Sequence, residues 1–179
     1  MIPQPTPLRI AIGGRMQVGK TTAADRLVER HGFVKYALAG PIKEIARSEF
    51  GWDGRKDARG RRLLQEIGTV GRHYESDIWL ERFAARLAAE DPPRAVVDDL
   101  RLAREEEFLR RLGFVCVLIT RAPRLVPDVA GGDTAAHETE TEIGHVGVDA
   151  QIDNSGSFED LYRKLDELVA GLEAVRVVR

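Results

Sequence analysis

The chain has 179 residues, which suits one domain with a sizeable core, and its 43% hydrophobic and 31% charged residues are typical of a globular protein. Its formal net charge of -2 argues against a protein that wraps nucleic acid. The first ten residues lack the apolar core of a signal peptide and no stretch reaches the length of a membrane span, so we expect a cytoplasmic protein without membrane contact.

The first predicted elements are a buried strand, formed by the apolar run from Leu8 to Ile12, and a helix over residues 22–30. Between them lies the complete phosphate-binding motif Gly14-Arg15-Met16-Gln17-Val18-Gly19-Lys20-Thr21, in the strand–loop–helix order that the motif requires. We expect backbone N–H groups of this loop and of Thr22 to bind the phosphates of ATP. Lys20 is expected to reach the β- and γ-phosphates, and the Thr21 hydroxyl to ligate Mg²⁺. The alternative is a Gly-rich turn without a ligand.

The middle of the chain alternates between strand and helix patterns. We expect strands over residues 33–37, 94–98 and 114–120, and helices over residues 41–50, 58–75, 78–90 and 101–112. The one cysteine of the chain, Cys116, lies in the most apolar of these strands. A lone cysteine excludes a disulfide framework, and this position favours a buried, inert thiol.

The last third of the chain begins with a segment that has no convincing element. Residues 121–147 are rich in Pro, Gly, Thr and acidic residues, which is typical of a lid or a functional loop. A short strand over 148–152 and a helix over 158–172 follow, with Ser157 as the expected N-cap because Asp160 stands three residues on. The whole pattern predicts one α/β domain over residues 1–179, with three layers (α/β/α) around a five-stranded parallel sheet.

Two carboxylates lie at the end of the third predicted strand. We expect Asp98 to orient Mg²⁺ through water and Asp99 to accept a hydrogen bond from a substrate hydroxyl, although either could instead cap the next helix. Arg101 follows them at the mouth of the sheet, where its guanidinium suits a monophosphate. Glu105, one helical turn later, is placed to brace Arg101.

A phosphate loop alone leaves GTPases, motor ATPases, small kinases and ATP sensors open. The chain has no Asn-Lys-x-Asp guanine-binding motif, and 179 residues are few for a ring-forming ATPase or a helicase. A kinase of small phosphorylated substrates needs a triphosphate loop, a second anion pocket and a mobile cover. The sequence contains candidates for all three.

Several further segments occur in the order of a known family. They are Leu38 to Lys43, Arg62 to Gly68, Arg72, Asp77 to Trp79, Asp98 to Arg101 with Glu105, His137 to Glu140, and Ile152 to Ser157. Together with Gly14 to Thr21, they span most of the chain, which resembles the phage-type deoxynucleoside monophosphate kinases of the nucleoside monophosphate kinase group. The departures are Gly40, where an Asp is common, and Thr139, where a Ser is usual.

The resemblance implies transfer of the γ-phosphoryl group of ATP to a deoxynucleoside 5′-monophosphate, with Mg²⁺ as cofactor. It implies a substrate-binding helical arm at about residues 39–91 and a lid at about residues 121–147. The catalytic residues it implies are Lys20, Asp99, Arg101, Arg121 and Arg124, the last two closing over the transferred group with the lid. The residues that it implies for binding of the acceptor are Lys43, Gln65, Arg72, Trp79, Asp99, Arg101 and Glu105. By fold analogy, Asn154 is expected beside the adenine of ATP.

Other interpretations stay open at this point. Each of the cations taken singly is as readily a solvated surface charge, and the spacing of Trp79 equally suits a core residue. The basic run Arg55, Lys56, Arg59, Arg61 and Arg62 is a funnel for nucleotides, a solvated face or a nucleic-acid contact, of which the last is disfavoured.

The sequence also bears on a zinc site and on competing functions. The spacing of His137, Glu138, Glu140, Glu142 and His145 argues against zinc. The competing functions are a kinase of another phosphorylated acceptor, such as phosphomevalonate or dephospho-coenzyme A, and a non-catalytic ATP-binding module. We expect small nucleotides and no nucleic acid as partners, and a homodimer is neither required nor excluded.

Overall fold

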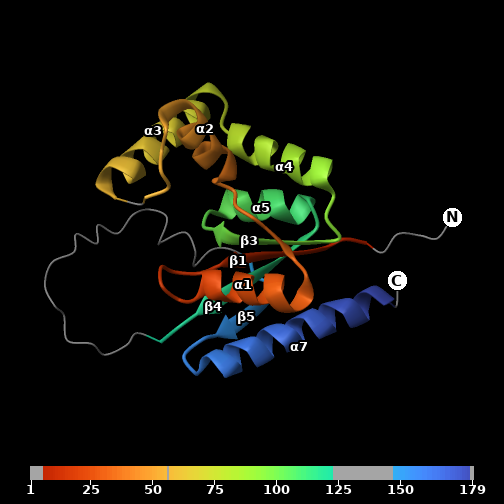
Figure 1. Ribbon diagram of the computed structural model, residues 1–179. Coiled ribbons are helices and arrows are strands. Elements are labelled where there is room, and N and C mark those ends of the chain that lie inside the picture. The colour runs from red at the N-terminus through yellow and green to blue at the C-terminus, as the bar shows by residue number, and fades with distance from the viewer. Residues whose placement is uncertain (1–5, 56, 123–146, 178–179) are drawn as a thin grey trace, which may run out of the picture. The chain divides into compact units, whose positions relative to one another are not determined.

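The computed structural model describes residues 6–55, 57–122 and 147–177 (Figure 1). Its sheet consists of β1 (Leu8–Gly13), β2 (Val34–Tyr36), β3 (Arg94–Leu100), β4 (Phe114–Thr120) and β5 (Ala150–Asp153), in the order β2-β3-β1-β4-β5. Strand β1 pairs in parallel with both β3 and β4, and β4 pairs in parallel with β5. The expected α/β fold with a five-stranded parallel sheet is confirmed.

The chain divides into two compact units, one formed by Met1–Lys35 with Pro93–Arg179 and the other by Tyr36–Pro92. The expectation of a single domain stays a prediction. The bounds of the second unit are close to those expected for the helical arm, residues 39–91. Each unit has its own packed interior.

The first unit contains the sheet and the helices α1 (Lys20–His31), α5 (Ala103–Arg111) and α7 (Phe158–Val177). Figure 1 shows α5 on one face of the sheet and α1 and α7 on the other, which gives the expected three layers. Helix α7 is longer than the predicted 158–172 and begins as expected. The Ser157 hydroxyl accepts a hydrogen bond from the backbone N–H of Asp160 at 3.2 Å, and the Asp160 carboxylate accepts one from the N–H of Ser157 at 3.4 Å.

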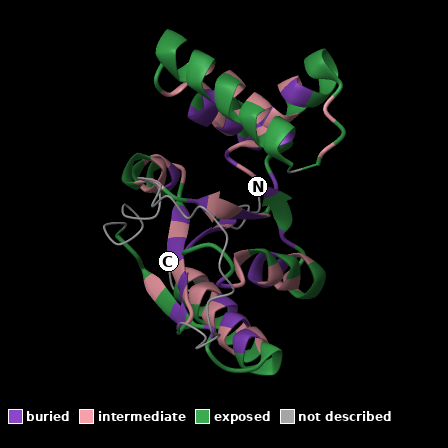
Figure 2. Cartoon of the chain, turned by 90° about the vertical axis from the view of Figure 1, so that its left-hand side faces the viewer, coloured by how far each residue is buried: buried purple, intermediate pink, exposed green. Residues whose placement is uncertain are grey.

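The core of the first unit is built around β1. Ile10 and Ile12 are fully buried, and they cluster with Leu27 of α1 and with Leu161 and Leu165 of α7. The two leucines of α7 are four residues apart and therefore lie on one face of the helix. Figure 2 shows such buried residues on the strands and along one face of α7, and exposed residues on the other face of that helix. Truncating any one of them to alanine would cost about 2 to 5 kcal/mol.

Strand β5 is anchored by Asp149, the residue that precedes it. The Asp149 carboxylate accepts a hydrogen bond from the backbone N–H of Cys116 at 2.7 Å and one from the guanidinium of Arg110 at 2.9 Å. Strand β5 begins at Ala150, later than the predicted residue 148. Burial raises the pKa of the Cys116 thiol to about 11, as suits an inert thiol.

The second unit consists of α2 (Gly40–Phe50), α3 (Ala58–Tyr74) and α4 (Ile78–Glu90), which pack on one another. The rings of Tyr36 and Phe83 meet edge to face, with their centroids 6.2 Å apart. The Tyr36 hydroxyl donates to the Glu90 carboxylate at 2.6 Å, so its polar end is satisfied as its ring is buried. Asp57 caps α3 by accepting a hydrogen bond from the N–H of Gly60 at 2.7 Å.

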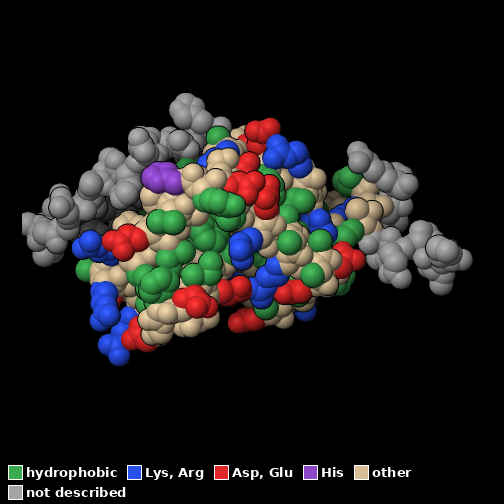
Figure 3. Space-filling view, turned by 90° about the horizontal axis from the view of Figure 1, so that it is seen from above, with side chains coloured by type: hydrophobic (Ala, Val, Ile, Leu, Met, Phe, Trp, Pro, Cys, Tyr) green, Lys and Arg blue, Asp and Glu red, His purple; other side chains and the backbone are tan. Residues whose placement is uncertain are grey.

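The basic run of the second unit is partly neutralised by neighbouring carboxylates. Arg55 forms an ion pair with Asp53 at 2.9 Å, and Arg62 forms one with Glu66 at 2.8 Å. Figure 3 shows Lys and Arg side chains interspersed with Asp and Glu on the face that it draws. This mixture favours a solvated face over a continuous positive field. Lys56 of this run lies outside the described residues.

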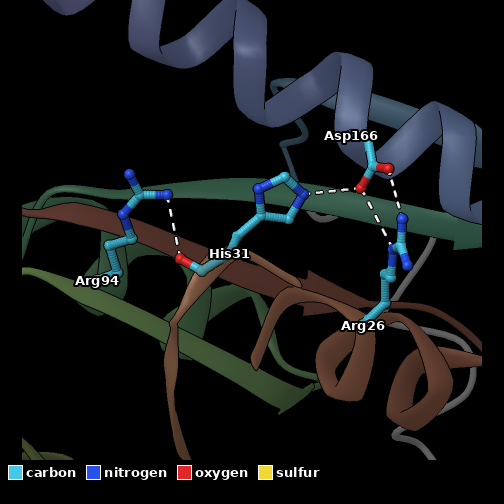
Figure 4. Close-up of polar contacts among 4 residues, drawn as sticks. All are labelled: Arg26, His31, Arg94 and Asp166. Carbon is cyan, nitrogen blue, oxygen red and sulfur yellow. Dashed lines mark hydrogen bonds and ion pairs between the residues drawn. The ribbon is translucent and has the colours of Figure 1, made fainter. Parts of the chain in front are cut away.

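Helices α1 and α7 are joined by Asp166, which faces Arg26 and His31 of α1 (Figure 4). Its Oδ2 accepts a hydrogen bond from Arg26 Nη2 at 2.6 Å, and its Oδ1 lies 2.7 Å from Nε2 of His31. Arg94 of β3 donates to the backbone carbonyl of His31 at 3.1 Å. The hydrogen bond from Arg26 lowers the pKa of Asp166; partial burial opposes this shift, and the contact with His31 adds to it.

This lowered pKa gives a prediction about stability and pH. The contribution of Asp166 is present above the ordinary aspartate pKa of about 4 and is lost as the pH falls through the lower value of the folded state. We expect Asp166→Asn to reduce the free energy of unfolding at pH 7 by less than about 1 kcal/mol, because the site is partly exposed. The deficit should shrink as the pH falls below about 4, measured by urea denaturation. Glu167→Gln, which affects only an ion pair within α7, is the matched control. A deficit that is the same at every pH would contradict the prediction.

Candidate functional site

The phosphate loop leaves β1 at Gly13 and enters α1 at Lys20. Gly14 (φ 141°) and Gly19 (φ 100°) adopt positive φ values that glycine tolerates and most residues do not. A Cβ atom on Gly14 would lie 2.3 Å from the carbonyl oxygen of Ile119, so the loop starts in close contact with the end of β4. Gln17, an exposed residue near the apex, also has a positive φ of 63°. The tight curl that the motif predicts is therefore present.

The first turn of α1 carries the features of an anion site. Its N-cap is Gly19, which makes no side-chain cap hydrogen bond, and this fully described turn contains no acidic residue. Its N–H groups and the helix dipole therefore favour a bound phosphate. The ammonium of Lys20 lies over the loop, with Nζ 2.7 Å from the carbonyl oxygens of both Gly14 and Arg15. Thr21 and Thr22 follow in the same turn.

Asp98 of β3 is held by Lys35, a residue that the sequence analysis did not single out. The Lys35 ammonium lies 2.9 Å from Oδ2 of Asp98 and 3.0 Å from Oδ1 of Asp25 on α1. The side chain of Asp98 is 13% exposed and that of Asp25 is 53% exposed. Burial is the largest single effect on Lys35 and disfavours its charged form, but the hydrogen bonds to the two carboxylates and their negative charges together raise the pKa of Lys35. The only sequence signal for this contact was a lysine within the predicted strand 33–37.

Glu105 fixes the backbone around Arg101, the next expected site residue. Its carboxylate accepts hydrogen bonds from the backbone N–H groups of Arg101 at 2.9 Å and Leu102 at 3.0 Å, so Glu105 caps α5 and braces the backbone of Arg101. Burial raises the pKa of Glu105, although these two hydrogen bonds oppose the shift and the charge of Asp99 adds to it. The guanidinium of Arg101 is exposed and forms no ion pair with any described residue.

Asn154 is buried against the phosphate loop. Its Nδ2 donates to the carbonyl oxygen of Val18 at 2.8 Å, and its backbone N–H donates to the carbonyl of Thr120 at 2.7 Å. The half-buried Arg121 follows Thr120 directly. The structure thus places Asn154 at the loop and Arg121 at the end of β4. The expected adenine contact of Asn154 stays a prediction.

The remaining acceptor candidates lie in the second unit: Lys43 on α2, Gln65 and Arg72 on α3, and Trp79 on α4. Gln65 and Arg72 are exposed and Lys43 is half-buried.

Trp79 is packed as a core residue. It is 8% exposed, and its Nε1 donates to the carbonyl of Gly68 at 3.0 Å. A Cβ on Gly71 would lie 2.2 Å from its ring. Trp79 therefore takes the core position that its spacing equally suits, with its indole joining α4 to α3, and its part in acceptor binding stays a prediction.

Some expected residues lie outside the described part of the chain. They are Arg124, His137, Glu138, Glu140, Glu142 and His145. Within residues 6–55, 57–122 and 147–177, no three His, Cys, Asp or Glu side chains are grouped so as to hold a metal ion. No helix in the described ranges combines the length and the apolar character needed to cross a membrane.

The burial of Asp98 gives a prediction about its pairing with Lys35. We expect Lys35→Met to lower the free energy of unfolding by about 1 kcal/mol or more, because a mostly buried carboxylate loses its charged partner. A double-mutant cycle in urea with Asp98→Asn measures the coupling energy. The matched cycle with the more exposed Asp25→Asn should give the smaller value. Equal coupling energies in the two cycles would contradict the role of burial.

No known family model matches the chain. Among curated proteins, one from Acanthamoeba polyphaga mimivirus is named "Putative deoxynucleotide monophosphate kinase". It is 27% identical over 186 residues, covering 87% of this chain and 93% of that protein.

Two solved structures show the same arrangement of elements. A dephospho-CoA kinase from Campylobacter jejuni has a TM-score of 0.59 at 12% identity, covering 92% of this chain and 96% of that one. TT1252 from Thermus thermophilus has a TM-score of 0.54 at 20% identity, covering 93% and 98%. At these identities the structures establish the fold alone. The chain therefore has a P-loop α/β fold and is similar in sequence to a protein named as a deoxynucleotide monophosphate kinase.

Proposed function

We propose that this chain transfers the γ-phosphoryl group of ATP to a deoxynucleoside 5′-monophosphate, which yields ADP and a deoxynucleoside diphosphate. The observation that carries the proposal is the phosphate loop, with two glycines at positive φ, an α1 N-terminus without a side-chain cap, and the Lys20 ammonium over the loop. The sequence similarity to the mimivirus protein supports this class of acceptor.

This phosphoryl transfer requires mainly that the protein positions the reactants and neutralises their charge. An oxygen of the acceptor phosphate attacks the γ-phosphorus, and the bond between that phosphorus and the β,γ-bridging oxygen breaks, so ADP leaves with the electron pair. The acceptor oxygen is already a competent nucleophile. The loop N–H groups and Lys20 hold the donor and offset the charge that gathers on its phosphates.

The oxygen atoms of Thr21 and Asp98 suit Mg²⁺, which prefers hydroxyl, carboxylate and phosphate oxygens. Bound there, Mg²⁺ would neutralise phosphate charge. Asp98 is mostly buried and held by Lys35, so one donor of this pair is fixed by the fold.

The acceptor phosphate requires cations of its own, because it must approach a second anion. We assign this role to the exposed guanidinium of Arg101, whose backbone is fixed by Glu105, together with Lys43 and Arg72. Gln65 would bind the base, and Asp99 would accept a hydrogen bond from the sugar. Arg121 and Arg124 would neutralise the transferred group.

The function is tested with a panel of acceptors, assayed with ATP and Mg²⁺ by coupled detection of ADP. We expect turnover with one or more deoxynucleoside monophosphates and none with dephospho-coenzyme A, phosphomevalonate or water. Turnover with one of those two compounds alone would assign the other kind of kinase. ATP binding without acceptor-dependent turnover would instead indicate a non-catalytic ATP-binding module.

A second prediction isolates the acceptor site. We expect Arg101→Ala to raise the KM for the deoxynucleoside monophosphate by about 10-fold or more, because a charge-assisted contact to its phosphate is lost. The KM for ATP should change little. Arg104→Ala removes an exposed arginine three residues later and is the matched control. A parallel rise in both KM values would refute the assignment of Arg101 to the acceptor.

A further inference from the structure

Asn154 is a polar side chain in an otherwise apolar interior. It is 5% exposed, and it is the one polar or charged residue that is buried to this degree in the described ranges. Burying an amide costs free energy unless hydrogen bonds replace those it makes with water. Its contacts therefore indicate what this burial achieves.

Asn154 connects three segments that are distant in sequence. It follows β5, its backbone N–H donates to the carbonyl of Thr120 in β4, and its side-chain amide donates to the carbonyl of Val18 in the phosphate loop. It also packs directly on Gly19, because a Cβ added there would lie 2.4 Å from Nδ2. The backbone of Asn154 is therefore fixed on the sheet, and its side-chain amide holds a single peptide group of the loop.

That peptide group is the one between Val18 and Gly19. A peptide unit is planar and trans, so its carbonyl oxygen and its N–H point in opposite directions. Holding the Val18 carbonyl toward Asn154 therefore directs the Gly19 N–H to the other side. Glycine at position 19, with φ 100°, would permit this peptide to rotate, because no side chain restricts it. A rotated peptide would present a carbonyl oxygen to the bound phosphates and repel them.

We propose that Asn154 is a positioning residue that fixes the Val18–Gly19 peptide so that the Gly19 N–H faces the phosphates of the bound nucleotide. The inference rests on the proposed function only for the identity of the ligand, a triphosphate. It differs from an adenine contact because it acts on the phosphate loop and is therefore independent of the base.

The test compares Asn154→Asp and Asn154→Ala in titration calorimetry with ATP, GTP and inorganic tripolyphosphate, each with Mg²⁺. Asp has the shape of Asn but cannot donate to the Val18 carbonyl when ionised, and it places an oxygen against that carbonyl. We expect all three ligands to bind about 10-fold or more weakly to both variants. The Asn154→Asp variant should bind them more weakly than Asn154→Ala, although the aspartate side chain fills the site better than alanine does. A role in packing alone would give the opposite order.

The matched control for the added charge is Gln151→Glu, which makes the same amide-to-carboxylate change on β5. Gln151 is exposed, and its amide lies 3.4 Å from the Thr120 hydroxyl, which can itself donate to a carboxylate. This variant should bind tripolyphosphate nearly as well as the wild type. Circular dichroism and thermal melting establish that each variant is folded. If the Asp variant does not fold, the comparison of Ala with the wild type decides the question.

Four results would overturn the inference. They are unchanged binding of tripolyphosphate, a loss confined to ATP, weaker binding by the Ala variant than by the Asp variant, and an equal loss in Gln151→Glu. The outcome is separable from that of the proposed function. Weakened tripolyphosphate binding without any phosphoryl transfer to monophosphates would support the role of Asn154 and refute the acceptor. Normal phosphoryl transfer to monophosphates, together with tripolyphosphate binding that is unchanged in the Asn154 variants, would support the acceptor and refute the role of Asn154.

Discussion

The pairing of β1 with β3 on one side and β4 on the other is the constraint on which the rest of the structure depends. The three strands are parallel, so their carboxyl ends meet at one edge of the sheet. The phosphate loop after β1, the two carboxylates at the end of β3, and Thr120 at the end of β4 therefore lie at the same edge. Moving β1 by one residue would turn each of its side chains to the other face of the sheet and displace the loop from all of these partners.

Three polar residues support this edge by holding other groups in place. Lys35 holds the carboxylate of Asp98, Glu105 caps the helix that begins after Arg101, and Asn154 holds a peptide of the loop. In each case the cost of burying a polar or charged group is offset by a directed hydrogen bond or ion pair. The edge of the sheet is thus organised before a ligand is bound, which lowers the entropic cost of binding.

The two adjacent aspartates acquire different environments from their position on a strand. Successive strand residues point to opposite faces of a sheet, so Asp98 pairs with Lys35, whereas the charge of Asp99 acts on Glu105 of α5. The separate roles of the two aspartates toward Mg²⁺ and the acceptor stay predictions. In the second unit, Trp79 illustrates the same principle, because its partners Gly68 and Gly71 lie on a different helix.

The sequence by itself determined the order of strands and helices, the phosphate loop and its helix, and the burial of Cys116, because these depend on local spacing and apolar periodicity. It also placed Glu105 near Arg101, but the contact is an N-terminal cap of α5 that reaches the backbone N–H of Arg101, and not a pair of side chains one helical turn apart. Only the tertiary structure decided that Lys35 belongs to Asp98, that Asn154 contacts the loop, and that residues 36–92 form a separate compact unit. Those facts depend on which strands become neighbours and which segments pack together. No local pattern specifies contacts between residues that are 63 or 136 positions apart, such as Lys35 with Asp98 or Val18 with Asn154.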